Sequence, residues 1–315
     1  MRPAGSIIAF STASGAGFGL LVLLLATHMA GLLGDDLALL GAGFGVAFGL
    51  ITGGLIASTF HLGHPERMLL ALKEWRSSWL SREALLALAA YPLGLAYLGW
   101  VAAGEFNAGP IALGLVTLLV GLTTVYCTAM IYASLKPIFA WHSALVPACY
   151  LGLALMTGAL LLLFLAQATN SSAIAALFWL AIGLLLIGLA LKRAYWRRLD
   201  RGAGDSTAES ATGLGRFGRV RQFEAPSTGQ SYVMHEMGFA IARRHARALR
   251  RATQVFAFLA PLLFLIVGAL LPAPGPHVLD ALAVVACAFG ITLERWLFFA
   301  EARHAATLYY GAIRA

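Results

Sequence analysis

Apolar residues run through this sequence in long stretches that are separated by short breaks of charged residues, glycine and proline. A hydrocarbon layer about 30 Å thick needs about 20 consecutive apolar residues for each crossing helix. The stretches therefore predict an all-α fold: a polytopic integral membrane protein with an eight-transmembrane-helix bundle. The predicted spans are 5–33, 38–62, 83–103, 110–134, 143–167, 171–191, 253–271 and 277–299.

The connections between the predicted spans alternate in length and in charge. Four short connections contain acidic residues or no charge, and neither Lys nor Arg: 34–37, 104–109, 168–170 and 272–276. The loop and terminal cations lie on the other side: Arg2, Arg67, Lys73, Arg76, Arg82, Lys136, the segment 192–251, Arg303 and Arg314. By the positive-inside rule, that side and both termini are expected to face the cytoplasm.

The composition of the chain is that of a membrane protein. Of the 315 residues, 60% are hydrophobic and 11% are charged, about half the charged fraction of an ordinary soluble domain. We divide the chain into transmembrane helices 1–6 (1–191), a basic cytoplasmic loop with an amphipathic helix (192–252), and helices 7–8 with a cytoplasmic tail (253–315). Three cysteines are isolated in apolar runs and predict neither disulfides nor a metal or iron–sulfur site: Cys127, Cys149 and Cys287.

The basic loop is the only sizeable region outside the predicted spans. Residues 192–251 hold 13 Lys/Arg and 5 Asp/Glu, a net charge of +8 that equals the formal charge of the whole chain. Residues 200–230, rich in Gly, Ser and Thr, predict irregular structure that needs a partner to order it. Residues 235–251 predict a helix with one apolar and one arginine-rich face. It either rests on anionic lipid headgroups or docks a cytoplasmic protein subunit.

The densest group of polar side chains at a membrane boundary lies where the second predicted span ends and the third begins. His61 closes the second span, Pro65 stops the helix, and Glu83 opens the third span. Ionisable groups at this depth are costly and often mark a functional site. Oxidation of a quinol needs acceptors for two protons, which an imidazole and a carboxylate can supply. We therefore predict a site for quinone binding and proton exchange at His61 and Glu83.

Each of these residues also has a plain structural explanation. A lone His61 is more often a satisfied histidine at a helix end. Ser81 is a candidate N-cap for the third helix, which would put Glu83 in the first turn, where the helix dipole favours an anion. The proximity of both groups at one boundary favours the site.

Six further residues form a second tier of candidates: His64, Trp75, Arg76, Arg82, Glu294 and Arg295. Trp75, Arg76 and Arg82 would orient the headgroup or contact a partner, or else simply anchor helix ends at the interface. Glu294 and Arg295 lie near the cytoplasmic end of the last span. They either pair with each other or line the same pocket.

Two other functional classes are compatible with a helical membrane protein. A haem-b anchor needs histidines at matching depth on facing helices. His28 lies toward one side, whereas His61, His142 and His304 lie toward the other, which does not suit two haems and leaves a single haem open. A transporter usually has broken helices and charges near the midplane. The span centres here carry glycines, as in 41–54, but no charge, which favours helix packing instead.

The boundary motifs resemble those of a known family. Residues 61–67 and 75–83 are similar to the signature of the DmsC-type membrane anchor of dimethyl sulfoxide reductase. The similarity extends over all eight spans and includes Trp141. Residues 206–215 and 234–239 resemble the sulfite dehydrogenase branch of that family (SoeC-like anchors).

This resemblance implies a three-subunit assembly at a bacterial inner membrane. A molybdopterin catalytic subunit and an iron–sulfur, ferredoxin-like subunit would dock on the cytoplasmic face of this anchor, which would contain no substrate-converting residues of its own. The family's quinol-site histidine and glutamate correspond to His61 and Glu83. The expected function is electron transfer from sulfite to ubiquinone or menaquinone. The alternative is the anchor of a dimethyl sulfoxide-type reductase that oxidises menaquinol, although the long basic insertion after the sixth span departs from the reductase anchors.

Overall fold

The computed structural model describes residues 4–60, 63–64, 68–202, 206–224 and 241–310. Within these ranges every regular element is a helix, and eight helices are long and apolar enough to cross a membrane. The predicted bundle is confirmed. The spans are α1 (Gly5–Met29), α2 (Leu37–Thr59), α4 (Trp79–Ala102), α5 (Ala108–Ala133), α6 (Leu145–Ala168), α7 (Ile174–Arg201), a seventh span ending in α11 (Ala260–Ala269), and α12 (Gly275–Ala300). Shorter helices lie between or after them: α3 (Met68–Ala71), η2 (Leu72–Glu74), α8 (Ala208–Thr212), η3 (Leu214–Phe217) and η5 (Ala305–Tyr310).

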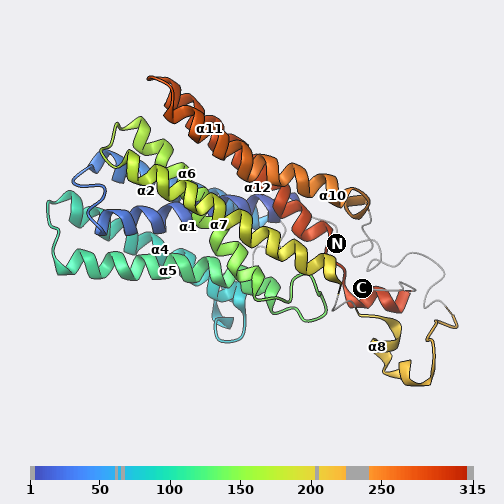
Figure 1. Cartoon of the computed structure of the whole chain (residues 1–315). Coiled ribbons are helices and arrows are strands. Elements are labelled where there is room, and N and C mark those ends of the chain that lie inside the picture. Colours follow the sequence, from blue (N-terminus) through green and yellow to red (C-terminus); the bar gives the residue numbers. More distant parts are fainter. Residues whose placement is uncertain (1–3, 61–62, 65–67, 203–205, 225–240, 311–315) are drawn as a thin grey trace.

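The chain crosses back and forth through the bundle, and its two ends lie at the same end of the bundle (Figure 1). We call this the basic end, because it carries the cations of the connections α2–α4, α5–α6 and α7–α10. The opposite end, which we call the acidic end, carries Asp35, Asp36 and Glu105. The charge asymmetry expected from the sequence is therefore present in the fold.

Helices α1 and α6 form the centre of the bundle and are the most buried of the spans. They pack on each other, and α1 also contacts α2, α5 and α12. Helices α4 and α5 pair on one side of this centre, while α7, α11 and α12 cover the other side. Residues from opposite sides can therefore meet only across α1, α6 or the ends of the bundle.

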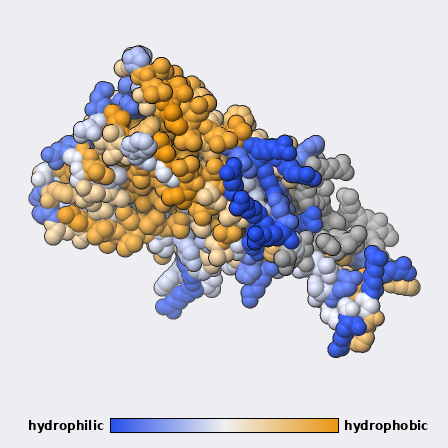
Figure 2. Space-filling model, in the orientation of Figure 1, coloured by the Kyte–Doolittle hydropathy of each residue, from blue (hydrophilic) through white to orange (hydrophobic). Residues whose placement is uncertain are grey.

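The surface shows where a bilayer would lie. Hydrophobic side chains cover the flanks of the helices, and hydrophilic side chains gather toward the basic end (Figure 2). Leu119 is 59% exposed and Trp179 is 69% exposed on these flanks. Water would make such a surface costly, whereas lipid tails are as apolar as the side chains themselves.

Helix α7 is longer than the sequence predicted. It ends at Arg201 instead of 191, because lysine and arginine are good helix formers and the first cations do not stop it. Gly202 ends it in the left-handed conformation, with φ of 59°. As a result Lys192, which the sequence analysis places in the loop, lies within the helix and is buried.

The seventh span also begins earlier than predicted. Helix α10 (Ile241–Gln254) runs through a π-helical turn, η4 (Val255–Leu259), directly into α11. The helix predicted over 235–251 is thus confirmed in its described part and is continuous with the span, while 235–240 lie outside the described residues. In the region expected to be irregular, α8 and η3 are the short helices that the structure describes.

Glycines set the close approach of the two central helices. A Cβ at Gly19 of α1 would lie 1.7 Å from the carbonyl oxygen of Ala154, and a Cβ at Gly158 of α6 would lie 2.2 Å from the Gly19 carbonyl carbon. In the glycine-rich α2, by contrast, Gly49 has no atom within 4 Å of its Cβ position. Not every glycine of 41–54, which the sequence predicted to pack against a neighbouring helix, therefore lies at a close helix contact.

We expect Gly19→Ala to separate α1 from α6 and to destabilise the bundle by about 1–3 kcal/mol, because the added methyl group overlaps backbone atoms. Gly49→Ala is the matched control and should not lower stability, because its added methyl group meets no atom within 4 Å and alanine is the better helix former. Thermal unfolding of the two variants in mild detergent, followed by tryptophan fluorescence, measures the difference. Equal unfolding temperatures would contradict the assigned role of Gly19.

Candidate functional site

Glu83 lies deeper in its helix than the sequence suggested. The N-cap of α4 is Ser78, whose hydroxyl accepts a hydrogen bond from the Ser81 backbone N–H at 3.3 Å; the prediction of Ser81 as N-cap is wrong. Glu83 is consequently in the second turn, and only 3% of it is exposed. Favourable interaction with the helix dipole in the first turn therefore does not explain this carboxyl group.

The partner of Glu83 is a threonine on the neighbouring helix. The Thr128 hydroxyl of α5 is hydrogen-bonded to Glu83 Oε1 and also lies 3.1 Å from the carbonyl oxygen of Thr124. One hydroxyl proton cannot serve both acceptors. Either Glu83 is a carboxylate that accepts from Thr128, or it is a neutral acid that donates to Thr128 while Thr128 donates to Thr124. The pair can therefore hold or release a proton without losing its hydrogen bond.

The other predicted site residues have different surroundings. His61 lies outside the described residues, so its position relative to Glu83 remains a prediction. His64, Trp75 and Arg76 are exposed in the α2–α4 connection. Arg82 donates to the Trp75 carbonyl oxygen at 2.8 Å and to the Arg76 carbonyl oxygen at 2.6 Å. His64, Trp75 and Arg76 thus belong to the connection at the basic end, and Arg82 of α4 holds that connection against the helix.

A buried ion cluster lies on the other side of the bundle. Glu294 Oε1 pairs with the ammonium group of Lys192, and Glu294 Oε2 lies 3.4 Å from Arg295. All three side chains are at most 3% exposed. The predicted contact between Glu294 and Arg295 is present, but it is the longer of two ion pairs. The sequence reasoning missed Lys192, although an acid inside an apolar span signals that a cation must lie nearby.

Aromatic rings complete the surroundings of this cluster. The ammonium group of Lys192 lies 4.0 Å from the ring centre of Tyr195 and 5.2 Å from that of Trp196. The Arg295 guanidinium lies 3.7 Å from the ring centre of Tyr150. Cation–π attraction of this kind is stronger where water is excluded, so the rings offset part of the cost of burying two cations.

Close helix contact makes the burial possible. A Cβ at Gly290 of α12 would lie 2.2 Å from the Ala257 nitrogen in η4, and a Cβ at Gly188 of α7 would lie 3.2 Å from the Phe258 ring. Glu294 and Lys192 follow these glycines by four residues, which is about one helical turn. The glycines and the π-helical turn therefore bring α7, α12 and the seventh span together where the charges pair.

A small cavity lies between Thr128 and Arg295. Hydroxyl groups and one guanidinium group supply its polar wall: Ser11, Ser14, Thr128, Tyr150 and Arg295. It has room for about one water molecule. Thr128 touches both this cavity and Glu83, so the cavity joins the predicted carboxyl site on α4 to the ion cluster on α12.

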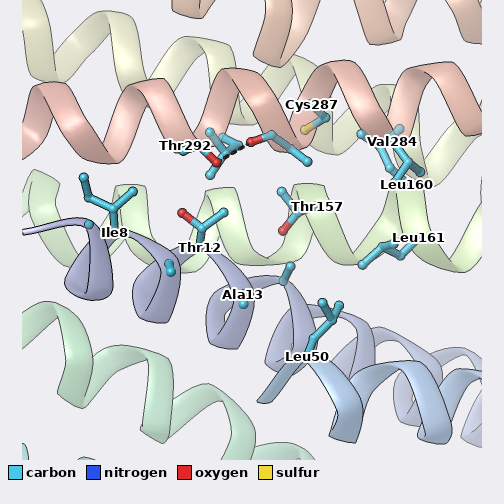
Figure 3. Close-up of a pocket in the computed structure, with 15 residues that line it drawn as sticks. Ile8, Thr12, Ala13, Leu50, Thr157, Leu160, Leu161, Val284, Cys287 and Thr292 are labelled. Carbon is cyan, nitrogen blue, oxygen red and sulfur yellow. Dashed lines mark hydrogen bonds between the residues drawn. The ribbon is translucent and has the colours of Figure 1, made fainter. Parts of the chain in front are cut away.

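A larger cavity of about 570 Å³ lies on the other face of α1, between α1, α6 and α12 (Figure 3). Thr157 donates to the Leu153 carbonyl oxygen at 2.9 Å, and Thr292 donates to that of Ala288 at 2.8 Å. The rest of the lining is mainly aliphatic. This wall suits a hydrocarbon chain, and its described residues present no ionisable carboxyl or imidazole group that could exchange protons with a quinone headgroup.

A second ion cluster lies at the basic end. Arg250 binds Asp200 at 2.6 Å and Glu301 at 2.9 Å and so links the ends of α7, α10 and α12. Burial raises the pKa of Glu301 above its usual value, and Arg250 partly opposes that shift. Trp196 lies between the clusters: its ring centre is 5.2 Å from Lys192 and 5.8 Å from the Arg250 guanidinium carbon.

Of the three described histidines considered for haem binding, His28 lies at the opposite end of the bundle from His142 and His304. At the acidic end of α1, His28 Nδ1 lies 2.6 Å from the Tyr97 hydroxyl. His142, in the α5–α6 connection at the basic end, has its Nδ1 2.8 Å from the Ala133 carbonyl oxygen. His304 Nδ1 accepts from the Ala306 N–H at 3.0 Å, and burial lowers the pKa of this imidazole.

The fold and the site define a multi-pass membrane protein with a buried carboxyl group at its basic end. Residues 3–300 match the family model described as DMSO reductase anchor subunit (DmsC), and the chain belongs to this family of membrane anchor subunits. The chain is also 32% identical over 330 residues to a sulfite dehydrogenase subunit of Allochromatium vinosum, covering 99% of this chain and 100% of that protein. No solved structure matches.

These matches confirm the family inferred from the boundary motifs. An anchor subunit of this family belongs to a complex with catalytic subunits. The chain is therefore the membrane anchor of a complex of the DMSO reductase or sulfite dehydrogenase type.

The charge balance of the buried cluster predicts an order of stability. Glu294→Gln leaves two buried cations without an anion, whereas Lys192→Met leaves Glu294 paired with Arg295. We expect E294Q to lower the free energy of unfolding by about 3–5 kcal/mol and K192M to lower it by less. Thermal unfolding of the purified variants tests the order. If K192M were less stable than E294Q, the net charge of the cluster would not determine its contribution to the free energy of unfolding.

Proposed function

We propose that this chain is the quinone-reactive membrane anchor of a sulfite dehydrogenase and passes electrons from sulfite oxidation to the quinone pool. Glu83 carries the proposal: it is a buried carboxyl group, in the second turn of α4 near the basic end, whose bond to Thr128 accommodates either protonation state. The sulfite branch is supported by the relative from Allochromatium vinosum, a sulfite dehydrogenase subunit that this chain matches over its full length. The basic end then faces the cytoplasm of a bacterial inner membrane, with both termini there, as the loop cations favour.

In the proposed reaction, the quinone is the substrate of this anchor. Reduction to the quinol takes up two electrons and two protons. The electrons come from an iron–sulfur centre of a docked partner. Glu83 gives one proton to a quinone oxygen and becomes a carboxylate that Thr128 stabilises by donating its hydrogen bond. His61 gives the other proton, and both groups are then reprotonated.

The partners of this chain are proposed to be a ferredoxin-like iron–sulfur subunit and a molybdopterin subunit on the basic end. The segment 206–224 supports this docking, because Phe217 is 73% exposed and Phe223 is 100% exposed on a stretch outside the spans. Aromatic side chains left open among charged ones are typical of protein interfaces. Anionic lipid remains the other proposed contact of the arginines on α10.

A second proposed function is the anchor of a dimethyl sulfoxide-type reductase. The description of the matching family model favours it. Electrons would then flow from menaquinol to the partner, and the same two groups would accept the protons.

The test is to purify the complex through a tag on this chain and to measure its metals and its quinone reactions. We expect molybdenum and iron to co-purify and sulfite to reduce a soluble quinone. Glu83→Gln and His61→Ala should each lower the quinone reaction at least about 100-fold, because each removes a positioned proton donor. Sulfite oxidation with an artificial acceptor that takes electrons from the catalytic partner should persist.

Glu105→Gln is the matched control, since Glu105 is an exposed carboxyl group at the acidic end. It should leave the quinone reaction unchanged. Recovery of the chain without metals or quinone activity would overturn the proposal. Dimethyl sulfoxide reduction without sulfite oxidation would select the second function.

A further inference from the structure

The small polar cavity contains two buried groups whose hydrogen-bonding capacity the rest of the site does not use. The Tyr150 hydroxyl and Arg295 Nε have no hydrogen-bond partner among the described residues. Both residues line the cavity and are at most 3% exposed. Hydrogen-bond donors left unsatisfied at such depth are costly. In proteins they are commonly satisfied by an ordered water in a polar cavity of this size.

The charges around the cavity are also unbalanced. Lys192 and Arg295 are cations and Glu294 is an anion, so the buried cluster carries one excess positive charge. Glu301, nearer the surface, is already paired with Arg250. Among the described residues, Glu83 is the acid that reaches the other wall of the cavity, through Thr128. A carboxylate at Glu83 would make the interior neutral.

We propose that an ordered water in this cavity connects Glu83, through Thr128, to Tyr150 and Arg295, and that Arg295 is a positioning residue for proton exchange at Glu83. The inference rests on the proposed function, because it concerns the proton that Glu83 gives to the quinone. Arg295 does not touch the quinone. Its fixed charge, held in place by Glu294, stabilises the carboxylate that remains after the proton has left.

The proton balance of the step is simple. The Glu83 O–H bond breaks and a quinone O–H bond forms, with the electrons supplied by the partner's iron–sulfur centre. Glu83 regains a proton from Thr128 as Thr128 takes one from the water and the water takes one from the basic end, so that neither an alkoxide nor a hydroxide forms.

Several other titratable side chains interact electrostatically with Glu83 and belong to its environment. They are Cys127 and Tyr132 on α5 and Tyr150 on α6; Arg82 directly precedes Glu83 on α4. Of these and Arg295, only the two arginines carry charge near neutral pH. Arg82 is bound to the exposed connection, which leaves Arg295 as the interior charge that faces Glu83 through the cavity.

Two substitutions test the proposal in the intact complex. Tyr150→Phe removes one hydroxyl that has no partner among the described residues, and Arg295→Met leaves the neutral pair of Lys192 and Glu294. We expect each to slow quinone reduction at least about tenfold with little change in the quinone KM. In R295M the pH at which the reaction is half-maximal should also move upward, because Glu83 loses its compensating charge. The solvent deuterium isotope effect should rise in both.

Thr157→Val is the control, because its hydroxyl donates only within α6 and lines the apolar cavity. It should not alter rate, pH profile or isotope effect. Infrared difference spectra on quinone reduction add a direct readout: a Glu83 carboxyl band that is absent in E83Q should shift in R295M.

The outcomes separate the two proposals. If the unaltered complex does not react with quinone, the proposed function fails. If it reacts, and Y150F and R295M keep its rate, pH profile and carboxyl band while remaining assembled, the proposed function stands and this inference is wrong. An R295M complex that only loses thermal stability would assign Arg295 a structural role and would also overturn the inference.

Discussion

The pairing of charges inside an apolar bundle is the constraint on which this structure depends. Lys192, Glu294 and Arg295 are buried at a depth where a single unpaired ion would cost several kcal/mol. Their pairing requires α7 and α12 to lie close together, and Gly188, Gly290 and the π-helical turn in the seventh span provide that closeness. The helix arrangement on this side of the bundle therefore follows from charge as much as from apolar packing.

Most of the fold could be predicted, because the bilayer reduces the problem to finding apolar stretches of sufficient length. All eight spans are confirmed. The first span ends four residues earlier than predicted, at Met29 at the acidic end, and the largest errors occur at the basic end, where α7 and α10 continue through charged residues. Apolar stretches mark where a helix can lie in lipid, but backbone hydrogen bonding and a glycine in the left-handed conformation decide where it stops.

The candidate site was predictable only in part. Glu83 was found because a carboxyl group at a membrane boundary stands out in the sequence. Thr128, Tyr150 and Lys192 were missed, since their roles depend on which faces of four helices meet, and no local pattern reports that. Hydroxyl groups are common in membrane helices, where most bond to their own backbone, as Thr124 and Thr157 do here.

The extension of α7 beyond its apolar stretch has a mechanical consequence. About ten residues of helix rise about 15 Å past the predicted end of the span, and Arg250 ties their tip to the seventh and eighth spans. This helix is continuous from the buried Lys192 to the exposed Asp200, so the two residues are joined by rigid backbone. A force applied to Asp200 by any docked protein would therefore reach the ion pair in the membrane interior without passing through a flexible loop.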